Sequence, residues 1–290
     1  NTASPLTTIN ERQMLSNTYE ALVLGVRDYI HKNKFKGIII GLSGGIDSAL
    51  TLAIAYDALG PDSIRVVLMP SRYTAQMSID DAIKMADTLN IQHDTISIEP
   101  IFTSYLETLK ELFSPYPVNQ AEENIQARIR GNILMGLSNK TGDIVLTTGN
   151  KSELSVGYCT LYGDMAGGFA VIKDVPKTLV YKLAAYRNSI SDCIPHNIIK
   201  RPPSAELSED QLDEDSLPPY DILDTIIDMF VSQDCSIDKI CETGLEREIV
   251  IRVVNMIKQN EYKRRQAPIG IRISDRAYGK DRRYPITSGY

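Results

Sequence analysis

Short apolar runs alternate with amphipathic segments along the first half of the chain. The apolar runs have the length of buried strands and lie at 38–40, 65–70, 93–98 and 143–150. Apolar positions recur with helical spacing around and between them, at 11–32, 50–58, 79–89, 101–113 and 119–138. Strands that alternate with helices pair in parallel through right-handed crossovers. The pattern therefore predicts an α/β fold, with a doubly wound parallel sheet flanked by helices.

One helix start is also predicted from capping residues. Ser78 immediately precedes the amphipathic segment 79–89, and Asp81 follows three residues later. A hydroxyl and an acidic side chain at this spacing form a capping box at the first turn of a helix. We therefore expect Ser78 to be the N-cap of this helix.

The pattern changes in the last third of the chain. Six acidic residues lie among prolines and serines at 202–219. We expect a solvated, flexible loop there, or alternatively a lid over a ligand site. Helical periodicity resumes at about 220–232, 236–242 and 245–260, and the last thirty residues are basic and rich in turn formers. We expect a single domain over residues 1–290, with a C-terminal extension of helices and loops.

Composition narrows the class of protein. The 290 residues are 43% hydrophobic and 23% charged, as in ordinary globular proteins, and the net charge of −6 argues against nucleic-acid binding through a basic surface. No apolar run is long enough to span a bilayer, so we expect no membrane contact. The four cysteines show no CxxC spacing and are too few for a disulfide framework, so we expect the cytoplasm.

The sequence SGGIDS at 43–48 stands between a predicted strand and a predicted helix, and it indicates a phosphate-binding loop. Its glycines let backbone N–H groups face a ligand, the helix adds its positive end, and Ser43 and Ser48 add hydroxyl donors. The loop is not a Walker A motif, because the Gly-Lys-Ser/Thr ending is missing. Asp47 instead puts a carboxylate beside phosphates, which indicates a bound Mg²⁺; the alternative is that Asp47 only caps the helix.

These six residues, with the strand before them and the helix after them, resemble the signature of the ATP pyrophosphatase (PP-loop) superfamily. Members of that superfamily cleave ATP between its α and β phosphates and adenylate a substrate. The resemblance implies the adenine nucleotide alpha-hydrolase-like fold, with ATP as co-substrate and Mg²⁺ as cofactor.

A second group of polar residues follows the predicted strand at 143–150. Thr148 ends this strand and can offer its hydroxyl to a nucleotide, and Glu153 is placed to be the second carboxylate of a Mg²⁺ site with Asp47. Several glycines then predict a sharply turning loop that approaches a ligand closely, at positions 157, 163, 167 and 168. Taken alone, Glu153 or Asp164 would be interpreted as a solvated loop acid.

The full set of motifs resembles NAD synthetase. The motifs are SGGIDS, NIQARIRG at 124–131, TGNKSE at 148–153, YGDMAGGF at 162–169, and Lys177. Glu153, Asp164 and Lys177 are separated as in that family, which a generic PP-loop protein has no reason to reproduce. In the family, ATP adenylates the pyridine carboxylate of nicotinic acid adenine dinucleotide, and ammonia then displaces AMP to give NAD.

The resemblance implies roles for individual residues. Metal binding is implied for Asp47 and Glu153, and a part in the chemistry for Asp47, Ser48 and Lys177. ATP contacts are implied for Gly41, Leu42, Ser43, Gly44, Gly45, Ile46, Asp47, Ser48, Met69, Arg128 and Thr148. Contacts with the dinucleotide substrate are implied for Asn124, Tyr158, Asp164 and Lys177. Without the resemblance, Arg128 would be interpreted as part of a surface ion pair.

Basic residues near the C-terminus have two possible roles. Lys263, Arg264 and Arg265 either close over phosphates or form a basic surface patch. The first alternative adds Lys263 and Arg264 to the substrate-binding residues. The stretch 263–286 around them resembles the synthetase domain of the two-domain, glutamine-dependent members of the family more than the short, ammonia-dependent ones.

Those two-domain members carry an N-terminal, nitrilase-like glutaminase domain, for which this chain has no room because SGGIDS already falls at 43–48. We therefore expect the chain to use free ammonia, or to be the synthetase half of a larger enzyme that includes the glutaminase. Because the family builds its dinucleotide site across a two-fold interface, we also expect a homodimer, with the helices at 11–32 and 119–138 as candidates for the interface.

Two other functions stay open. One is a different adenylating PP-loop enzyme, such as the synthetase part of GMP synthetase, and the other is a regulator that binds ATP without turnover. The pairing of Asp47 with Glu153 argues against the regulator. The histidines His31, His93 and His196 lie outside the motifs, which fits direct adenylation and disfavours a covalent intermediate on the enzyme.

Overall fold

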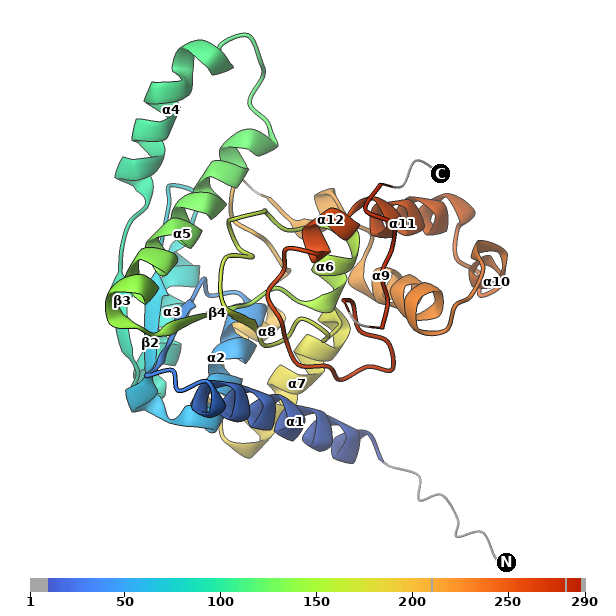
Figure 1. The fold of residues 1–290 in the computed structure, drawn as a ribbon, viewed down its shortest axis with the longest axis horizontal. Coiled ribbons are helices and arrows are strands. Elements are labelled where there is room, and N and C mark those ends of the chain that lie inside the picture. The colour runs from blue at the N-terminus through green and yellow to red at the C-terminus, as the bar shows by residue number, and fades with distance from the viewer. Residues whose placement is uncertain (1–9, 210, 280, 288–290) are drawn as a thin grey trace, which may run out of the picture.

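A parallel β-sheet forms the centre of the structure (Figure 1). The structure, a computed structural model, describes residues 10–209, 211–279 and 281–287. The strands are β1 Ile38–Gly41, β2 Ile64–Leu68, β3 Gln92–Thr95, β4 Ile144–Thr147 and β5 Phe169–Ala170. All pair in parallel, in the order β3-β2-β1-β4-β5, so the predicted doubly wound sheet is confirmed. Because β2 and β4 flank β1, the loop after β1 opens at the topological switch point, where such sheets bind ligands.

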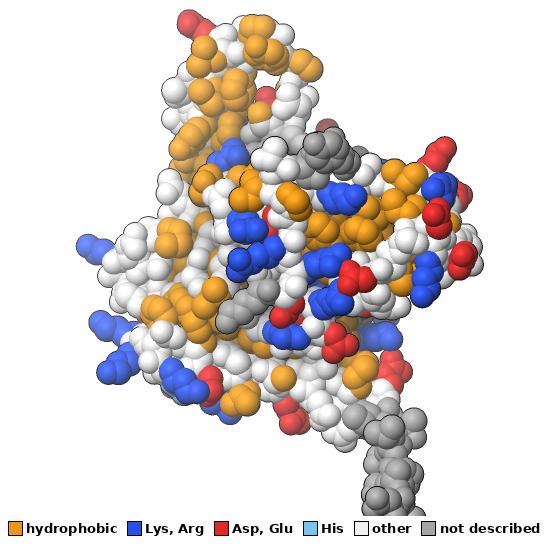
Figure 2. Space-filling view, turned by 45° about the vertical axis from the view of Figure 1, so that its right-hand side comes forward, with side chains coloured by type: hydrophobic (Ala, Val, Ile, Leu, Met, Phe, Trp, Pro, Cys, Tyr) orange, Lys and Arg blue, Asp and Glu red, His pale blue; other side chains and the backbone are white. Residues whose placement is uncertain are grey.

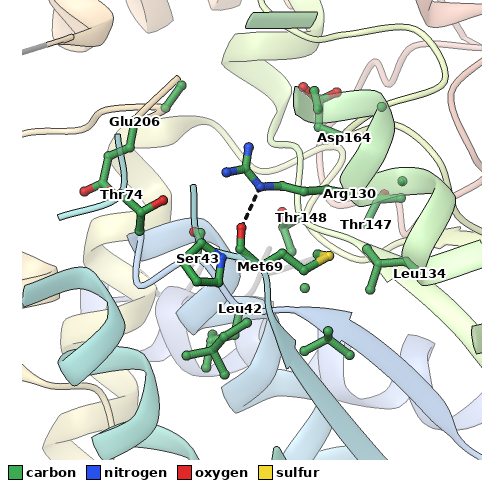
Figure 3. A pocket seen from close by; sticks show the side chains of 18 of the residues that line it. Leu42, Ser43, Met69, Thr74, Arg130, Leu134, Thr147, Thr148, Asp164 and Glu206 are labelled. Atoms are coloured by element: carbon green, nitrogen blue, oxygen red, sulfur yellow. Dashed lines mark hydrogen bonds between the residues drawn. The ribbon is translucent and has the colours of Figure 1, made fainter. Parts of the chain in front are cut away.

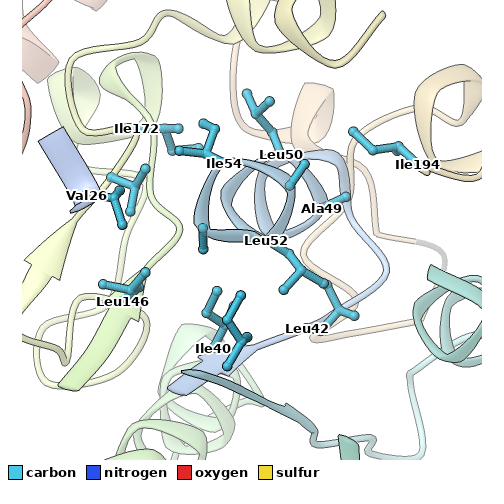
Figure 4. Close-up of a cluster of buried hydrophobic side chains, with 14 of the residues drawn as sticks. Val26, Ile40, Leu42, Ala49, Leu50, Leu52, Ile54, Leu146, Ile172 and Ile194 are labelled. Atoms are coloured by element: carbon cyan, nitrogen blue, oxygen red, sulfur yellow. The ribbon is translucent and has the colours of Figure 1, made fainter. Parts of the chain in front are cut away.

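Helices cover both faces of the sheet, because alternate strand residues point to opposite sides. Ile38 and Ile40 belong to a large core that also contains Leu50 and Leu52 (Figure 4), whereas Ile39 packs near Leu134 on the other face. The first face carries α1 Glu11–Lys32, α2 Ile46–Leu59, α3 Gln76–Thr88, α7 Lys177–Ile190 and α8 His196–Lys200. The second carries α5 Gln120–Thr141, against which α4 Glu99–Phe113 packs. None of the helices described is long and apolar enough to cross a membrane.

The C-terminal part of the chain builds a second hydrophobic core, on the right in Figure 1. Leu223, Val253 and Ile257 are fully buried in it, and Val156 is buried in the same core. Its helices are α6 Lys151–Val156, α9 Tyr220–Ile227, a π-helical turn Asp228–Ser232, α10 Ile237–Cys241, α11 Arg247–Gln259 and α12 Glu261–Arg264. The predicted C-terminal extension of helices and loops is therefore confirmed. Short 3₁₀ turns at Pro61–Ser63 and Asp213–Asp215 complete the described elements.

The acidic segment 202–219 is less solvated than its composition predicts. Asp213 is only 4% exposed, and its carboxylate accepts hydrogen bonds from the hydroxyls of Tyr220 at 2.7 Å and Tyr158 at 3.3 Å. Glu206 is half-buried and accepts a hydrogen bond from the Ser78 hydroxyl. The prediction of full solvation is wrong at these two residues, because distant hydroxyls satisfy their carboxylates. The flexibility of the segment stays a prediction.

The predicted start of α3 is also wrong. The helix begins at Gln76 with Ala75 as its N-cap, and Ser78 lies buried in the first turn. The Ser78 side chain is used instead by residues far along the chain, donating to Glu206 and accepting from Arg201 at 2.6 Å. A local capping pattern is thus overridden by tertiary partners.

Candidate active site

The loop between β1 and α2 is held by its own side chains and by α3. The Ser43 hydroxyl accepts a hydrogen bond from the Gly45 N–H at 3.1 Å, and the Ser48 hydroxyl donates to the Gly45 carbonyl at 3.0 Å. Gly44 has φ +79°, and a Cβ placed there would lie 2.2 Å from the Ser78 carbonyl oxygen. Glycine is therefore required at position 44 by both backbone conformation and space. The result is a concave turn at the N-terminus of α2, as a phosphate-binding loop needs.

Two carboxylates and one ammonium meet beside this loop. Lys177 Nζ lies 2.5 Å from Asp47 Oδ2 and 3.2 Å from Glu153 Oε1. Asn150, the N-cap of α6, donates from Nδ2 to Asp47 Oδ1 at 2.9 Å and accepts from the Glu153 N–H at 3.0 Å. The N-cap of α2 is Gly45, and no side chain caps it, so the alternative role of Asp47 as a helix cap is wrong.

The charged groups of this cluster shift one another's pKa values. Burial alone would lower the pKa of the Lys177 ammonium, but the carboxylates of Asp47 and Glu153 outweigh burial and raise that pKa. Burial raises the pKa of the Glu153 carboxyl; the Lys177 charge opposes this shift, and the Asp47 charge adds to it. One ammonium faces two carboxyl groups, so when both are ionised the cluster carries an excess of negative charge that a further cation can neutralise.

A large pocket and a smaller one open on either side of the loop. The large pocket, a cavity of about 260 Å³, lies between the ends of the strands and α5, with apolar walls that include Leu42, Met69 and Leu134 (Figure 3). The smaller one, about 140 Å³, contains Asp47 and Glu153 and is called the carboxylate pocket below. Both are lined by Ser43, Thr147, Thr148 and Asp164. The two pockets therefore meet over the phosphate loop.

Most of the predicted site residues lie at these pockets. The large pocket is lined by Gly41, Leu42, Ser43, Met69, Thr148 and Asp164 from the predicted set. The carboxylate pocket adds Gly45, Asp47, Ser48, Glu153 and Tyr158. Ile46 lines a third cavity behind the loop, Lys177 reaches the carboxylates from α7, and Gly44 forms the turn itself. The sequence motifs thus converge in space, although the roles assigned to their residues stay predictions.

Asp164 marks the junction of the two pockets. Its carboxylate accepts the Thr160 N–H at 2.9 and 3.1 Å and is accessible to water. The protein atoms around it nevertheless weaken its hydration and raise the pKa of the carboxyl to about 6. Asn124, also predicted to bind substrate, does not line either pocket and accepts a hydrogen bond from the Thr160 hydroxyl at 2.6 Å.

Two of the predicted cations, Arg128 and Lys263, lie elsewhere. Arg128 is exposed, and its Nε donates to the Leu161 carbonyl at 3.2 Å. Lys263 donates to the carbonyls of Gly157 at 2.7 Å and Cys159 at 2.8 Å. The structure therefore brings neither into the two pockets.

Arg264 is the clearest departure from the prediction. It is 6% exposed, pairs with Glu261, and donates to the Ser155 carbonyl at 2.6 Å and to the Ile257 carbonyl. Its guanidinium also covers the ring of Tyr278 at 4.7 Å. These internal contacts occupy the side chain away from both pockets, so this geometry gives its predicted substrate contact no support.

Residues that sequence reasoning missed also line the cavities. Arg130 and Glu206 line the large pocket, and Ser204 lines the carboxylate pocket. Arg130 belongs to the NIQARIRG motif, two residues after Arg128. Residues two apart on a helix point to different sides, so only the packing of α5 decides which arginine faces the cavity.

The two carboxylates fit a magnesium ion that binds together with phosphates. Asp47 and Glu153 converge on a single cation, the Lys177 ammonium. No cluster of three or more His, Cys, Asp or Glu side chains suited to a metal is found among the described residues. Mg²⁺ commonly uses one or two carboxylates and completes its shell with phosphate oxygens and water, so this donor set suits it.

The parallel sheet with a glycine-rich loop at its switch point defines the class, the adenine nucleotide alpha-hydrolase-like fold. A family model described as NAD synthase matches residues 18–267. The chain belongs to the NAD synthase family, which confirms the resemblance drawn from the motifs.

Proteins similar to this chain are named as NAD synthetases. The glutamine-dependent NAD(+) synthetase of Acinetobacter baylyi is 53% identical over 278 residues, which are 95% of this chain and 51% of that protein. The structure of glutamine-dependent NAD+ synthetase from Acinetobacter baumannii, in complex with ADP, is 48% identical with a TM-score of 0.65, covering 99% of this chain and 51% of that one. The NH3-dependent NAD synthetase of Campylobacter jejuni is 26% identical with a TM-score of 0.70, and the match covers 86% of this chain and 95% of that one. The chain spans about half the length of the curated relatives it matches.

Proposed function

We propose that this chain forms NAD, AMP and pyrophosphate from nicotinic acid adenine dinucleotide, ATP and ammonia. The observation that supports this most directly is the contact of Lys177 with Asp47 and Glu153 beside the phosphate loop. A catalytic site for adenylation needs cations and backbone N–H groups around the phosphates of ATP, next to a cavity for the acid. The single domain would carry both steps of the synthetase reaction.

Adenylation would activate the pyridine carboxylate, because a free carboxylate has oxide as its leaving group and is a poor acyl donor. A carboxylate oxygen would attack the α phosphorus of ATP, and the bond to the bridging oxygen of pyrophosphate would break. The N–H groups in the first turn of α2, at Ile46, Asp47 and Ser48, and the Lys177 ammonium would stabilise the charge that develops on the pyrophosphate oxygens. Asp47 and Glu153 would hold Mg²⁺, which adds electrostatic stabilisation of the phosphate oxygens when bound.

Amidation would follow at the same place. Ammonia would attack the carbonyl carbon of the mixed anhydride, the bond to the AMP oxygen would break, and one proton would leave the nitrogen. Water must be excluded, or the anhydride hydrolyses instead. Ser204 and Glu206, from the acidic segment, line the pockets and support a covering role for this part of the chain. Tyr158 and Asp164 would contact the pyridine half of the substrate.

Ammonia is proposed as the nitrogen donor of this chain. The NH3-dependent NAD synthetase of Campylobacter jejuni is covered over 95% of its length, so a domain of this size suffices in a relative. Glutamine use would need a cysteine nucleophile with a glutamate and a lysine around it. Cys159 lies in the carboxylate pocket and burial raises the pKa of its thiol to about 12, which disfavours a nucleophilic role.

A homodimer is also proposed. The hairpin of α4 and α5 projects from the molecule and carries exposed apolar side chains (Figure 2), among them Leu112, Tyr116 and Val118, the last 84% exposed. Such side chains on a projecting arm favour burial against a second copy. The exposed Arg128 on α5 would then lie near an interface, where this family builds its dinucleotide site. Sedimentation as a monomer at micromolar concentration, with full activity, would contradict the dimer.

The function is tested with the purified chain, ATP, Mg²⁺, ammonium and nicotinic acid adenine dinucleotide. We expect NAD and AMP, a rate that rises with pH as the unprotonated fraction of ammonia rises, and no NAD with glutamine as sole donor. Exchange of labelled pyrophosphate into ATP should be stimulated by nicotinic acid adenine dinucleotide. Stimulation by a different acid alone would favour another adenylating enzyme, and absence of AMP would favour a regulator.

A further inference from the structure

Among the described residues, one cation that lines the large pocket, Arg130, forms no salt bridge. Arg130, on α5, is partly buried, and its Nε donates to the Met69 carbonyl at 3.0 Å. Met69 follows β2, so this bond fixes the guanidinium over the ends of the strands. No hydrogen bond from either of its two terminal nitrogens to a described residue is found.

The nearby carboxylates are already engaged. Glu206 accepts from the Ser78 hydroxyl and from the Ala75 N–H at 3.3 Å, and it lies 3.7 Å from Arg201. Asp164 accepts from the Thr160 N–H. In the view of Figure 3 the guanidinium stands in the cavity between Glu206 and Asp164, with neither in contact.

The surroundings of Arg130 destabilise a charge that has no hydrogen-bonding partner. The pocket wall around Arg130 is largely apolar, with Leu42, Met69 and Leu134 among its residues. Burial lowers the pKa of Arg130 to about 10, although the Glu206 charge opposes the shift. A cation in such a wall is favoured when an anionic ligand completes its hydrogen bonds.

The position within the site identifies which anion fits. The proposed function puts the two terminal phosphates of ATP on the loop at 43–48 and the apolar adenine among the apolar walls of the large pocket. The α-phosphate must then lie between them, at the rim where Ser43 and Thr148 are shared by the two pockets. Arg130 lines the large pocket beside this rim.

We propose that the terminal nitrogens of Arg130 bind the α-phosphate of ATP, and the same phosphate in the acyl-adenylate and in AMP. Arg130, rather than Arg128, is then the arginine of the NIQARIRG motif that contacts the nucleotide. This inference rests on the proposed function, because it assumes that ATP occupies the large pocket. A planar guanidinium suits a phosphate, since it can donate two parallel hydrogen bonds to it.

The test compares ligands with and without the phosphate. Calorimetry measures the binding of AMP and of adenosine to the wild-type chain and to Arg130→Gln, Arg130→Lys and Arg128→Gln. Lys140→Gln, at an exposed position of the same helix, is the control for loss of a positive charge. Urea unfolding checks that each variant is folded, and Arg130→Lys retains a cation if the glutamine variant is unstable.

We expect Arg130→Gln to weaken AMP binding by about 10- to 100-fold, the usual loss for charge-assisted hydrogen bonds to phosphate, and adenosine binding by less than about threefold. Arg130→Lys should recover part of the AMP affinity, because it keeps the charge but not the planar pair of donors. Lys140→Gln should bind both ligands as the wild type does.

Two results would overturn the inference while the proposed function stands. Equal losses for AMP and adenosine in Arg130→Gln would mean that the guanidinium stacks on the base. Unchanged AMP binding in that variant, with a loss in Arg128→Gln, would mean that Arg128 is the nucleotide contact. A wild-type chain that binds neither ligand and forms no NAD would refute the proposed function and this inference together.

Discussion

Two groups of charged side chains in this molecule can be compared, one around the phosphate loop at the end of β1 and one along the C-terminal segment from Lys263 to Tyr284. At the loop, Asp47, Glu153 and Lys177 meet at the wall of a pocket. In the described part of the C-terminal segment, several cations bind backbone carbonyls or pair along the surface. Lys263 and Arg264 bind backbone carbonyls, and Arg276 pairs with Asp234.

The difference lies in what the backbone offers at each place. The loop precedes a helix, so its free N–H groups attract anions. Arg264 and Lys263 instead face the other end of a helix, because Ser155 and Gly157 are the last turn and the C-cap of α6. Unpaired carbonyls there attract cations. The basic side chains of Lys263 and Arg264 therefore fix the end of α6, whose first turn carries Glu153. Ala267 and Pro268, from the same segment, line the carboxylate pocket itself.

The largest expected effect is at the loop. Asp47→Asn should lower the pyrophosphate exchange rate by about 1,000-fold or more, because metal binding supplies several kcal/mol of charge stabilisation. The fold should stay intact in urea unfolding, because Glu153 still neutralises the Lys177 ammonium and asparagine can still accept a hydrogen bond from Asn150. Near-normal turnover in this variant, at saturating ATP and Mg²⁺, would contradict the proposal that Asp47 binds the metal.

Arg264→Gln should act in the opposite way, on stability rather than on chemistry. Removing one partner of a buried ion pair should lower the free energy of unfolding by about 3 kcal/mol, as measured in urea. Arg247→Gln, which breaks an exposed pair with Asp238, is the matched control and should leave the urea midpoint unchanged. If Arg264→Gln unfolds like the wild type but raises the KM for the dinucleotide steeply, the residue binds substrate after all.

Gly44→Ala tests whether the loop depends on its backbone shape. Alanine at φ +79° costs about 1–2 kcal/mol, and its Cβ would also meet the Ser78 carbonyl. We expect lower stability in urea and a weaker affinity for pyrophosphate, measured by calorimetry. Gly142→Ala is the control, because it shares a positive φ but its Cβ would meet only the Lys36 side chain, at an ordinary contact distance of 3.9 Å. Equal pyrophosphate affinity in both variants would argue against the loop as the phosphate site.

The smallest effect is expected for Lys263→Met. Loss of its two hydrogen bonds to the turn after α6 should lower the free energy of unfolding by about 1–2 kcal/mol. The KM for the dinucleotide should rise only a few-fold, because Tyr158 sits in that turn. A large rise in KM at unchanged stability would contradict this and restore the direct substrate contact predicted for Lys263.

The alternation of strands and helices and the position of the phosphate loop could be predicted from the sequence. The strand before SGGIDS and the helix after it follow from local apolar spacing, and the convergence of Asp47 with Glu153 follows because parallel strands end at one edge of the sheet. The helices α7 and α8 were not predicted, and neither were the short strand β5 and the short helix α6. β5 and α6 are brief, and their glycine-rich surroundings indicate a loop.

The sequence alone determined the family, the sheet and the identity of the loop, because these depend on local spacing and on motifs. Tertiary structure alone decided which cations face the pockets. Arg130 lines the large pocket, whereas Arg128 is exposed and Arg264 is buried against helix ends. It also decided that Ser78 binds Glu206 rather than capping α3. A charged side chain binds whichever unpaired group lies within reach, and that group comes from distant parts of the chain brought close only by packing.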